Sequence, residues 1–138
     1  MKILLISPAV DTEKRTNNGL MMPQLALYIL AGLTPPEHEV VIIEEETGHI
    51  DLEEESDMVG ISCMTANAPR AYELCREFKK RGKTVILGGV HPSILPDEAL
   101  QHADCVVVGE AEGVWEILIK DFQHNNLKRK YHNQKTTK

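Results

Sequence analysis

The fold of this chain is decided by one stretch of its sequence, Val85-Ile86-Leu87-Gly88-Gly89-Val90-His91-Pro92, residues 85–92. Its first three residues form a continuous apolar run, which is typical of a strand that is buried on both faces. The two glycines that follow leave the carboxyl end of this strand without side chains. Because open parallel sheets bind ligands in the crevice outside their strand ends, the stretch indicates a ligand that rests on bare backbone. A simple glycine turn is the alternative.

Four more apolar runs of strand length occur in the chain, and segments with helical spacing separate them. The five expected strands are residues 2–7, 40–43, 58–63, 84–87 and 105–108. The expected helices are residues 23–33, 67 or 68 to 81, 96–102 and 111–122. Strands that alternate with helices predict a parallel sheet with helices on both faces. For a domain of this size we expect a three-layer, flavodoxin-like (Rossmann-like) α/β fold with the strand order 2-1-3-4-5.

This fold places four loops at the carboxyl edge of the sheet, where a ligand would bind. They are residues 7–20, 62–67, 88–95 and 109–112. We expect residues 9–19 to be mobile, because they have few apolar anchors and end in Asn17-Asn18-Gly19. The helix from Pro23 to Leu33 is apolar nearly all round, so we expect it to be well buried.

The composition is that of a globular domain, with 42% hydrophobic and 26% charged residues among 138. The net charge of −6 gives no reason to expect a nucleic acid partner. Glu44 to Asp57 contains eight acidic residues and no basic one, and we interpret it as solvated surface. We expect residues 1–122 to form one domain and residues 123–138 to be a polar, basic tail or linker that frays.

The three cysteines, Cys63, Cys75 and Cys105, are widely spaced and form no Cys-x-x-Cys pair. They therefore predict neither a zinc site nor an iron–sulfur cluster. Each lies in an apolar run, so we expect reduced cysteines in the core, which fits a reducing compartment. The sequence has no apolar run of about 18 residues and no signal-peptide core at its start. We expect a cytoplasmic protein without a membrane partner.

Several ligand classes do not match the expected edge loops. A receiver domain needs acidic residues where the first and third strands end, but Ser7 and Cys63 stand there. The Gly-x-Gly-x-x-Gly of a dinucleotide site and the Gly-Lys-Ser/Thr of a P-loop do not occur in the sequence. Ser7-Pro8-Ala9-Val10 is a poor match to the phosphate loop of a flavodoxin, which is rich in Ser, Thr and Gly.

Six short motifs, each weak alone, are fairly specific in their order and spacing. They are Lys2-Ile3-Leu4-Leu5-Ile6-Ser7-Pro8, the helix at Pro23, His38-Glu39-Val40, Val59-Gly60-Ile61-Ser62, Gly88-Gly89-Val90-His91-Pro92 and Val108-Gly109-Glu110-Ala111-Glu112. Together they resemble the N-terminal cobalamin-binding domain of cobalamin-dependent radical S-adenosylmethionine enzymes. The resemblance extends over about residues 1–122.

The resemblance implies cobalamin as the cofactor, bound at the carboxyl edge of the sheet. Other cobalamin modules cradle the nucleotide tail with Ser-x-Leu after the third strand and Gly-Gly after the fourth. Ser62-Cys63-Met64 matches the first of these motifs with Met in place of Leu. The cofactor-binding residues that the resemblance implies are Ser7, Pro8, Ser62, Cys63, Met64, Thr65, Gly88, Gly89, His91, Pro92, Gly109 and Glu110. It implies no catalytic residue and no metal ligand in this chain.

Two family motifs do not occur in this sequence. The first is Asp-x-His-x-x-Gly after the first strand, whose His ligates cobalt in many cobalamin modules. We therefore expect cobalamin to bind base-off, without a His from that loop. The second is the Cys-x-x-x-Cys-x-x-Cys of the radical domain. The iron–sulfur cluster and S-adenosylmethionine would then belong to a missing C-terminal domain in cis, and we expect the full protein to be a methyltransferase-type enzyme. The chain is either an excised domain or a stand-alone carrier, and we expect it to be non-catalytic alone.

Other interpretations stay open beside this one. The chain is alternatively a binding module for a flavin or nucleotide at the same edge, or an interaction domain without a working site. His91 either meets the cofactor or is a partly exposed turn residue. Glu110 and Glu112 either form an acid pair or cap the last helix. Met21 and Met22 either line the upper face of the crevice or fill the core.

Overall fold

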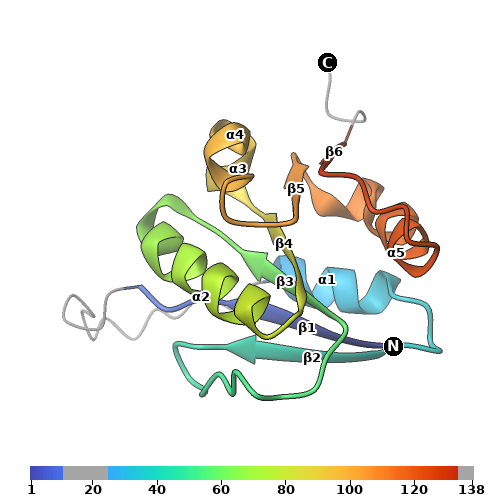
Figure 1. The fold of residues 1–138 in the computed structure, drawn as a ribbon, viewed down its shortest axis with the longest axis horizontal. Helices are drawn as coiled ribbons and strands as arrows, with labels where there is room; N and C mark the ends of the chain where they lie inside the picture. Colours follow the sequence, from blue (N-terminus) through green and yellow to red (C-terminus); the bar gives the residue numbers. More distant parts are fainter. Residues whose placement is uncertain (11–24, 134–138) are drawn as a thin grey trace.

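The fold is a single parallel sheet between two layers of helices, as the sequence predicts. A computed structural model of the chain describes residues 1–10 and 25–133. Its strands run in the order β2-β1-β3-β4-β5-β6, and every neighbouring pair is parallel (Figure 1). The strands are β1 (Lys2–Ser7), β2 (Glu39–Glu44), β3 (Met58–Ser62), β4 (Thr84–Gly88), β5 (Cys105–Val108) and β6 (Lys130–His132). The predicted order of the first five strands is confirmed.

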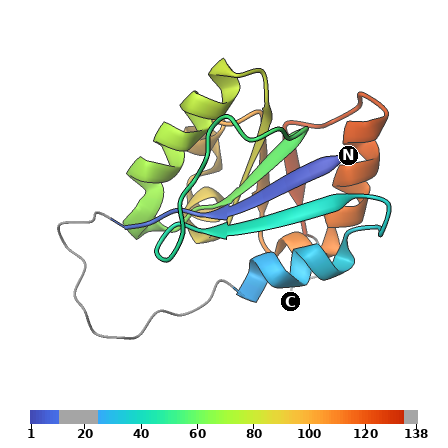
Figure 2. The ribbon, with the colours of Figure 1, turned by 90° about the horizontal axis from the view of Figure 1, so that it is seen from below.

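The helices cover both faces of this sheet. They are α1 (Leu25–Leu33), α2 (Ala68–Lys80), α3 (Val90–Ile94), α4 (Pro96–Ala99) and α5 (Trp115–Gln123), with short 3-10 turns η2 (Thr65–Asn67) and η3 (Ala111–Gly113). Figure 2 shows α2 on one side of the sheet and α1 with α5 on the other. None of the helices in the described part of the chain is long and apolar enough to cross a membrane.

The sheet divides the apolar side chains into two cores because successive strand residues point to opposite faces. On one face, Val59 and Leu87 pack in a cluster with Phe78 of α2. On the other face, Met58 and Ile86 pack in a cluster with Trp115 of α5. A fully buried side chain of this size contributes about 1.5–3 kcal/mol relative to an exposed one, so both helix layers are held chiefly by such burial. The continuous apolar runs of the strands reflect this two-sided burial.

Helix α2 shows how the local sequence sets an element. Its buried residues Ala71, Leu74, Cys75 and Phe78 follow the i, i+3, i+4, i+7 spacing of one helical face. The helix ends just before Gly82, whose φ of 77° is a conformation that glycine adopts without strain. The predicted boundaries agree with the structure to within one residue.

Helix α1 differs from its prediction. Only Leu27 and Leu30 are buried, whereas Leu25 is 67% exposed and Tyr28 is 47% exposed. The expectation of a well-buried helix is therefore wrong, because α1 lies in an outer layer and only its inner side meets the sheet and α5. The expectations for the mobile loop, for Pro23 and for Met21 and Met22 fall largely or wholly on residues 11–24, outside the described residues.

Two segments that the sequence indicates to be solvated make specific contacts instead. Residues 130–132 form β6, so the sheet has six strands rather than five and residues 123–133 are not a simple fraying tail. Tyr131, the buried residue of this strand, anchors it to the domain. In the acidic stretch, the Glu45 side chain is only 16% exposed, because it forms an ion pair with Arg70 at 2.6 Å and accepts a hydrogen bond from the Ala9 amide at 2.9 Å.

Candidate functional site

A largely apolar cavity of about 590 Å³ lies between the sheet and the layer of α1 and α5, and it reaches the carboxyl ends of β3, β4 and β5. Its walls come from α1, α3, Trp115 and the segment from Gly109 to Glu112. The few polar side chains on these walls are those of Ser62, Ser93, Glu110 and Glu112. A cavity of this size and lining suits an organic group with limited hydrogen-bonding capacity.

The floor of the cavity follows from the alternation of side chains along the strands. Gly60 and Ser62 on β3 share one face, and Ile86 and Gly88 on β4 share the same face beside them, in the register Ser62 to Gly88. Among the described residues, a Cβ atom added to Gly88 would meet only the Val107 Cβ, at 3.9 Å, so a side chain there would extend into the cavity. The missing side chain at this position therefore keeps the cavity open.

Gly60 is a cavity residue that the sequence reasoning missed. An added Cβ would lie 2.9 Å from Leu5 Cδ2 and 3.9 Å from the Trp115 ring. Even a methyl group would thus press on the floor and narrow the cavity. The signal was present in the sequence, because Gly60 lies two residues before Ser62 and so shares its face of the strand.

The second glycine of the pair has a different role from the first. Gly89 has a φ of 111°, and an added Cβ would lie 2.6 Å from the Cys63 carbonyl oxygen. The same segment is held by hydrogen bonds from the Cys63 amide to the Gly88 oxygen at 2.7 Å and from the His91 amide to the Cys63 oxygen at 3.1 Å. Gly89 is therefore a glycine because the turn requires one, as a side chain there would clash with Cys63. At Gly88 neither a clash with the backbone nor a positive φ requires a glycine.

Ser93 joins the ends of two strands at the cavity, and no sequence motif indicates this role. Its hydroxyl donates to the Gly89 oxygen at 2.8 Å and accepts from the Gly109 amide at 2.9 Å. Gly109 has a φ of 84°, which is again a glycine conformation. A serine in a short helix is too common to stand out, so this link is visible only once β4 and β5 are side by side.

Asn67 makes the corresponding link between the ends of β1 and β3. Its side chain is buried, and its amide nitrogen donates to the Pro8 oxygen at 3.1 Å while its amide oxygen accepts from the Met64 amide at 2.7 Å. The sequence indicates Asn67 only as a helix start. The bond to Pro8 is long-range, between residues 59 positions apart, and no local pattern predicts it.

The His91 ring does not line the cavity and lies instead in a polar cluster with residues of η2, α2 and α4. Its Nδ1 is 3.2 Å from Thr65 Oγ1 and its Nε2 is 2.8 Å from Glu98 Oε2. The Tyr72 hydroxyl also donates to Glu98, at 2.6 Å, and its ring stacks on His102 with 3.9 Å between centroids. The hydrogen bonds from Tyr72 and then His91 lower the pKa of Glu98 from its ordinary value.

The structure thus divides the twelve residues that the resemblance implies. Five line the cavity, namely Ser62, Gly88, Gly89, Gly109 and Glu110. The other seven do not contribute to its lining, although they lie in the same edge loops: Ser7, Pro8, Cys63, Met64, Thr65, His91 and Pro92.

Burial raises the pKa of the Cys63 thiol to about 12, so this cysteine is protonated at neutral pH. No group of three or more metal-ligating side chains occurs in the described ranges.

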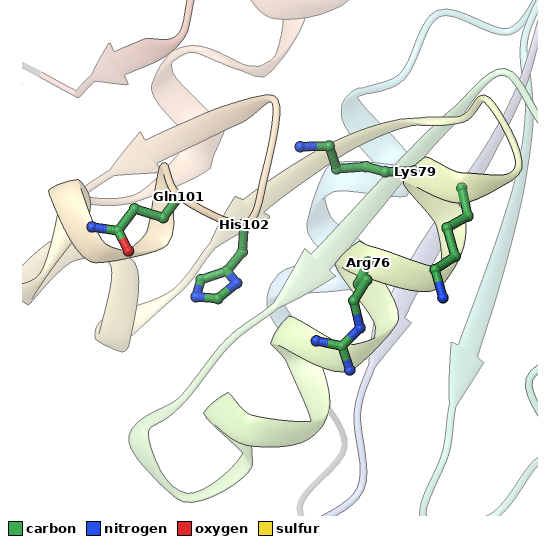
Figure 3. A pocket seen from close by; sticks show the side chains of 5 residues that line it. Arg76, Lys79, Gln101 and His102 are labelled. Carbon is green, nitrogen blue, oxygen red and sulfur yellow. The ribbon is translucent and has the colours of Figure 1, made fainter.

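A second cavity, of about 420 Å³, is basic rather than apolar. Figure 3 shows Arg76 and Lys79 on α2 at one side of this hollow and Gln101 and His102, which follow α4, at the other, and Lys80 completes its lining. It lies by the last turns of α2, which lead to the amino end of β4. Basic residues in the last turn of a helix are favoured by the helix dipole, so their presence here needs no ligand.

Known proteins resemble this chain in sequence and in fold. A family model described as "B12 binding domain" matches residues 16–119. Bacteriochlorophyllide d C-8(2)-methyltransferase of Chlorobaculum tepidum is 49% identical over 108 residues, which cover 78% of this chain and 24% of that protein. Bacteriochlorophyllide d C-12(1)-methyltransferase of the same organism is 36% identical over 132 residues, which cover 94% of this chain and 29% of that protein. The chain therefore spans about a quarter of the length of these relatives.

A solved structure agrees with the architecture. The N-terminal domain of a hypothetical protein from Thermotoga maritima superposes with a TM-score of 0.50 and 23% sequence identity, and the match covers 91% of this chain and 99% of that one. At that identity the likeness shows the fold alone.

Proposed function

The chain belongs to the B12-binding domain family, and from this premise we propose that it holds cobalamin at the carboxyl edge of its sheet as the cofactor module of a larger methyltransferase. The observation that carries this proposal is the cavity of about 590 Å³ with a glycine floor at the ends of β3 and β4. When bound, cobalamin supplies the cobalt chemistry of methyl transfer or related radical reactions. The chain itself supplies position, an apolar surrounding and hydrogen bonds.

The cavity fits the nucleotide tail of cobalamin, whose dimethylbenzimidazole base is flat and largely apolar. Gly60 and Gly88 leave room over the floor that a Cβ atom would take. Ser62 lies on the wall, where its hydroxyl can bond a ring nitrogen or another polar group of the tail. Ser93, bonded to Gly89 and Gly109, keeps the ends of β4 and β5 at a fixed separation. Among the remaining predicted edge residues, Met64 and Thr65 are exposed, and we assign these two to contacts with the corrin side of the cofactor. The side chains of Ser7, Pro8, Cys63 and Pro92 are buried and have no such role in this proposal.

We also propose that the tail's base is released from cobalt. The sequence has no His between Pro8 and Leu25, in the segment that follows β1. Both ring nitrogens of His91 lie within hydrogen-bond distance of other side chains, those of Thr65 and Glu98. An apolar cavity can take up the flat base once it has left cobalt, and the cavity beside Ser62 and Gly88 is the one we propose for it.

The complete enzyme needs chemistry that this chain does not encode. The sequence contains no Cys-x-x-x-Cys-x-x-Cys, so we assign the iron–sulfur cluster and S-adenosylmethionine to a radical domain outside this chain. The two relatives from Chlorobaculum tepidum are methyltransferases, and this supports methyl as the transferred group.

A direct test is to mix the purified chain with hydroxocobalamin, remove free cofactor by desalting, and record the visible spectrum of the protein fraction. We expect the cobalt chromophore to elute with the protein at micromolar concentration. Flavin mononucleotide and ATP, used in parallel at the same concentrations, are expected to elute separately. Elution of cobalamin apart from the protein would contradict the proposal, and elution of the flavin with it would favour the other small-ligand interpretation.

A further inference from the structure

The last strand of the described chain is attached to one wall of the cavity. Strand β6 runs beside β5 in the register Val106 to Lys130 and Val108 to His132, and it therefore ends at the same carboxyl edge. The family match ends at residue 119, so β6 lies beyond it. The contacts of this strand connect it to the segment that carries Gly109 and Glu110.

Strand β6 is firmly held by the body of the domain. Tyr131 is only 6% exposed and belongs to the core between the sheet and α5. Its hydroxyl donates to Asp121 at 2.6 Å and accepts from the Lys128 amide at 3.1 Å. The Val106 amide also donates to the Arg129 oxygen at 2.8 Å. A residue placed directly after β6 therefore has a fixed position relative to the sheet.

That residue is Asn133, and its contacts reach the cavity wall. Its amide donates to the Val108 oxygen at 3.1 Å, and its side-chain nitrogen donates to the Glu110 oxygen at 2.9 Å. A Cβ atom added to Gly113 would lie 2.8 Å from Asn133 Oδ1. The Asn133 side chain thus packs directly on the backbone of Gly113 and bonds the backbone of Glu110.

The wall from Gly109 to Glu112 is consequently held from two sides. Ser93 accepts a hydrogen bond from the Gly109 amide on one side, and Asn133 donates to Glu110 on the other. Gly109, with its positive φ, would otherwise be a pivot between these contacts. Fixing such a wall before the cofactor arrives lowers the ordering cost of binding.

We propose that Asn133 is a positioning residue for the cofactor cavity, and that β6 belongs to the cofactor-binding unit rather than to a linker. This inference rests on the proposed function, because the wall that Asn133 orders is part of the proposed cobalamin cavity. The side chain acts through the backbone of Glu110 and does not contact the cofactor.

The test compares Asn133→Asp with the parent chain. The substitution keeps the shape of the side chain, but a carboxylate oxygen cannot donate to the Glu110 oxygen and repels it. Asn126→Asp is the matched control, since it adds the same charge on an exposed residue whose side chain has no hydrogen bond among the described residues. Asn133→Ala removes the bond without adding charge, in case the aspartate disturbs folding.

Two readouts are needed, the Kd for hydroxocobalamin and the hydrogen exchange of cofactor-free protein. We expect Asn133→Ala to raise Kd by about two- to tenfold, as the loss of one hydrogen bond implies, and Asn133→Asp to raise it at least as much. We expect the amides of Gly109 and Val114 to exchange faster in both variants, while the amides of α2 exchange as in the parent. The Asn126→Asp control should match the parent in both readouts.

The outcomes separate this inference from the proposed function. An Asn133→Asp chain with the parent's Kd would overturn the positioning role, whatever its exchange rates. Unchanged exchange at Gly109 and Val114 would equally overturn it. A parent chain that fails to bind cobalamin would instead overturn the proposed function, and with it the cofactor role of the wall, while the exchange rates would still decide whether Asn133 orders it.

Discussion

Replacing Gly88 by valine tests the position of the cofactor tail. The Gly88 Cα lies at the carboxyl end of β4, and in the described part of the chain an added Cβ would have only the Val107 Cβ within 4 Å. Valine would place three carbon atoms in this space. Adding volume to a packed site costs about 1–3 kcal/mol, so we expect the Kd for hydroxocobalamin to rise about 5- to 150-fold.

The fold itself should tolerate this change. Gly88 is not among the glycines with positive φ, so a β-branched residue meets no backbone strain there. Valine also has a higher strand propensity than glycine. We therefore expect the thermal midpoint of Gly88→Val to be equal to or above that of the parent. Thr84→Val, on the same face of β4 at its other end, is the matched control for an added valine and should bind cobalamin as the parent does.

The measurement is a titration of each variant with hydroxocobalamin, followed by the change in its visible spectrum, together with a thermal melt. A folded Gly88→Val chain that binds cobalamin as tightly as the parent would show that the tail does not pass this strand end.

Three further changes have defined outcomes. Ser62→Ala should weaken cobalamin binding by about three- to tenfold, the range for one neutral hydrogen bond, and an unchanged Kd in the same titration would remove Ser62 from the site. Gly89→Ala should lower the free energy of unfolding by about 1–3 kcal/mol, because the new Cβ meets the Cys63 oxygen at 2.6 Å and φ is 111°; denaturant unfolding measures this, and a stable variant would contradict it. Tyr72→Phe should raise the pKa of Glu98, which NMR titration of the carboxyl group reports. The lowered pKa of Glu98 stabilises the folded state at pH values above 4.5, the ordinary pKa of the group, and this stabilisation is lost as the pH falls through the lowered pKa. Tyr72→Phe should therefore lose less stability on acidification than the parent does.

The sequence predicts the parallel sheet well because its strands are buried on both faces. The runs at β1, β3, β4 and β5 are apolar without interruption, and the helix spacing of α2 is regular. Strand β6 was missed because Tyr131 is a single apolar residue among polar ones. The exposure of α1 was missed because an apolar helix does not reveal which of its sides is covered by another layer.

The candidate site could be predicted only in part. The glycine pair and Ser62 stand out in the sequence, but the different roles of Gly88 and Gly89 depend on a backbone φ angle that no pattern encodes. Ser93, Asn67 and Asn133 act through long-range hydrogen bonds and are common residue types.

We propose that the tail's base leaves cobalt and enters the cavity beside Gly88, and the electron paramagnetic resonance spectrum of cob(II)alamin with and without excess protein tests this. A nitrogen bound to cobalt splits each cobalt line further, so free cob(II)alamin in its base-on form shows this splitting. We expect the splitting to disappear with the parent chain and to persist with Gly88→Val at the same concentrations. Nitrogen splitting that persists in the parent complex would show that the base stays on cobalt.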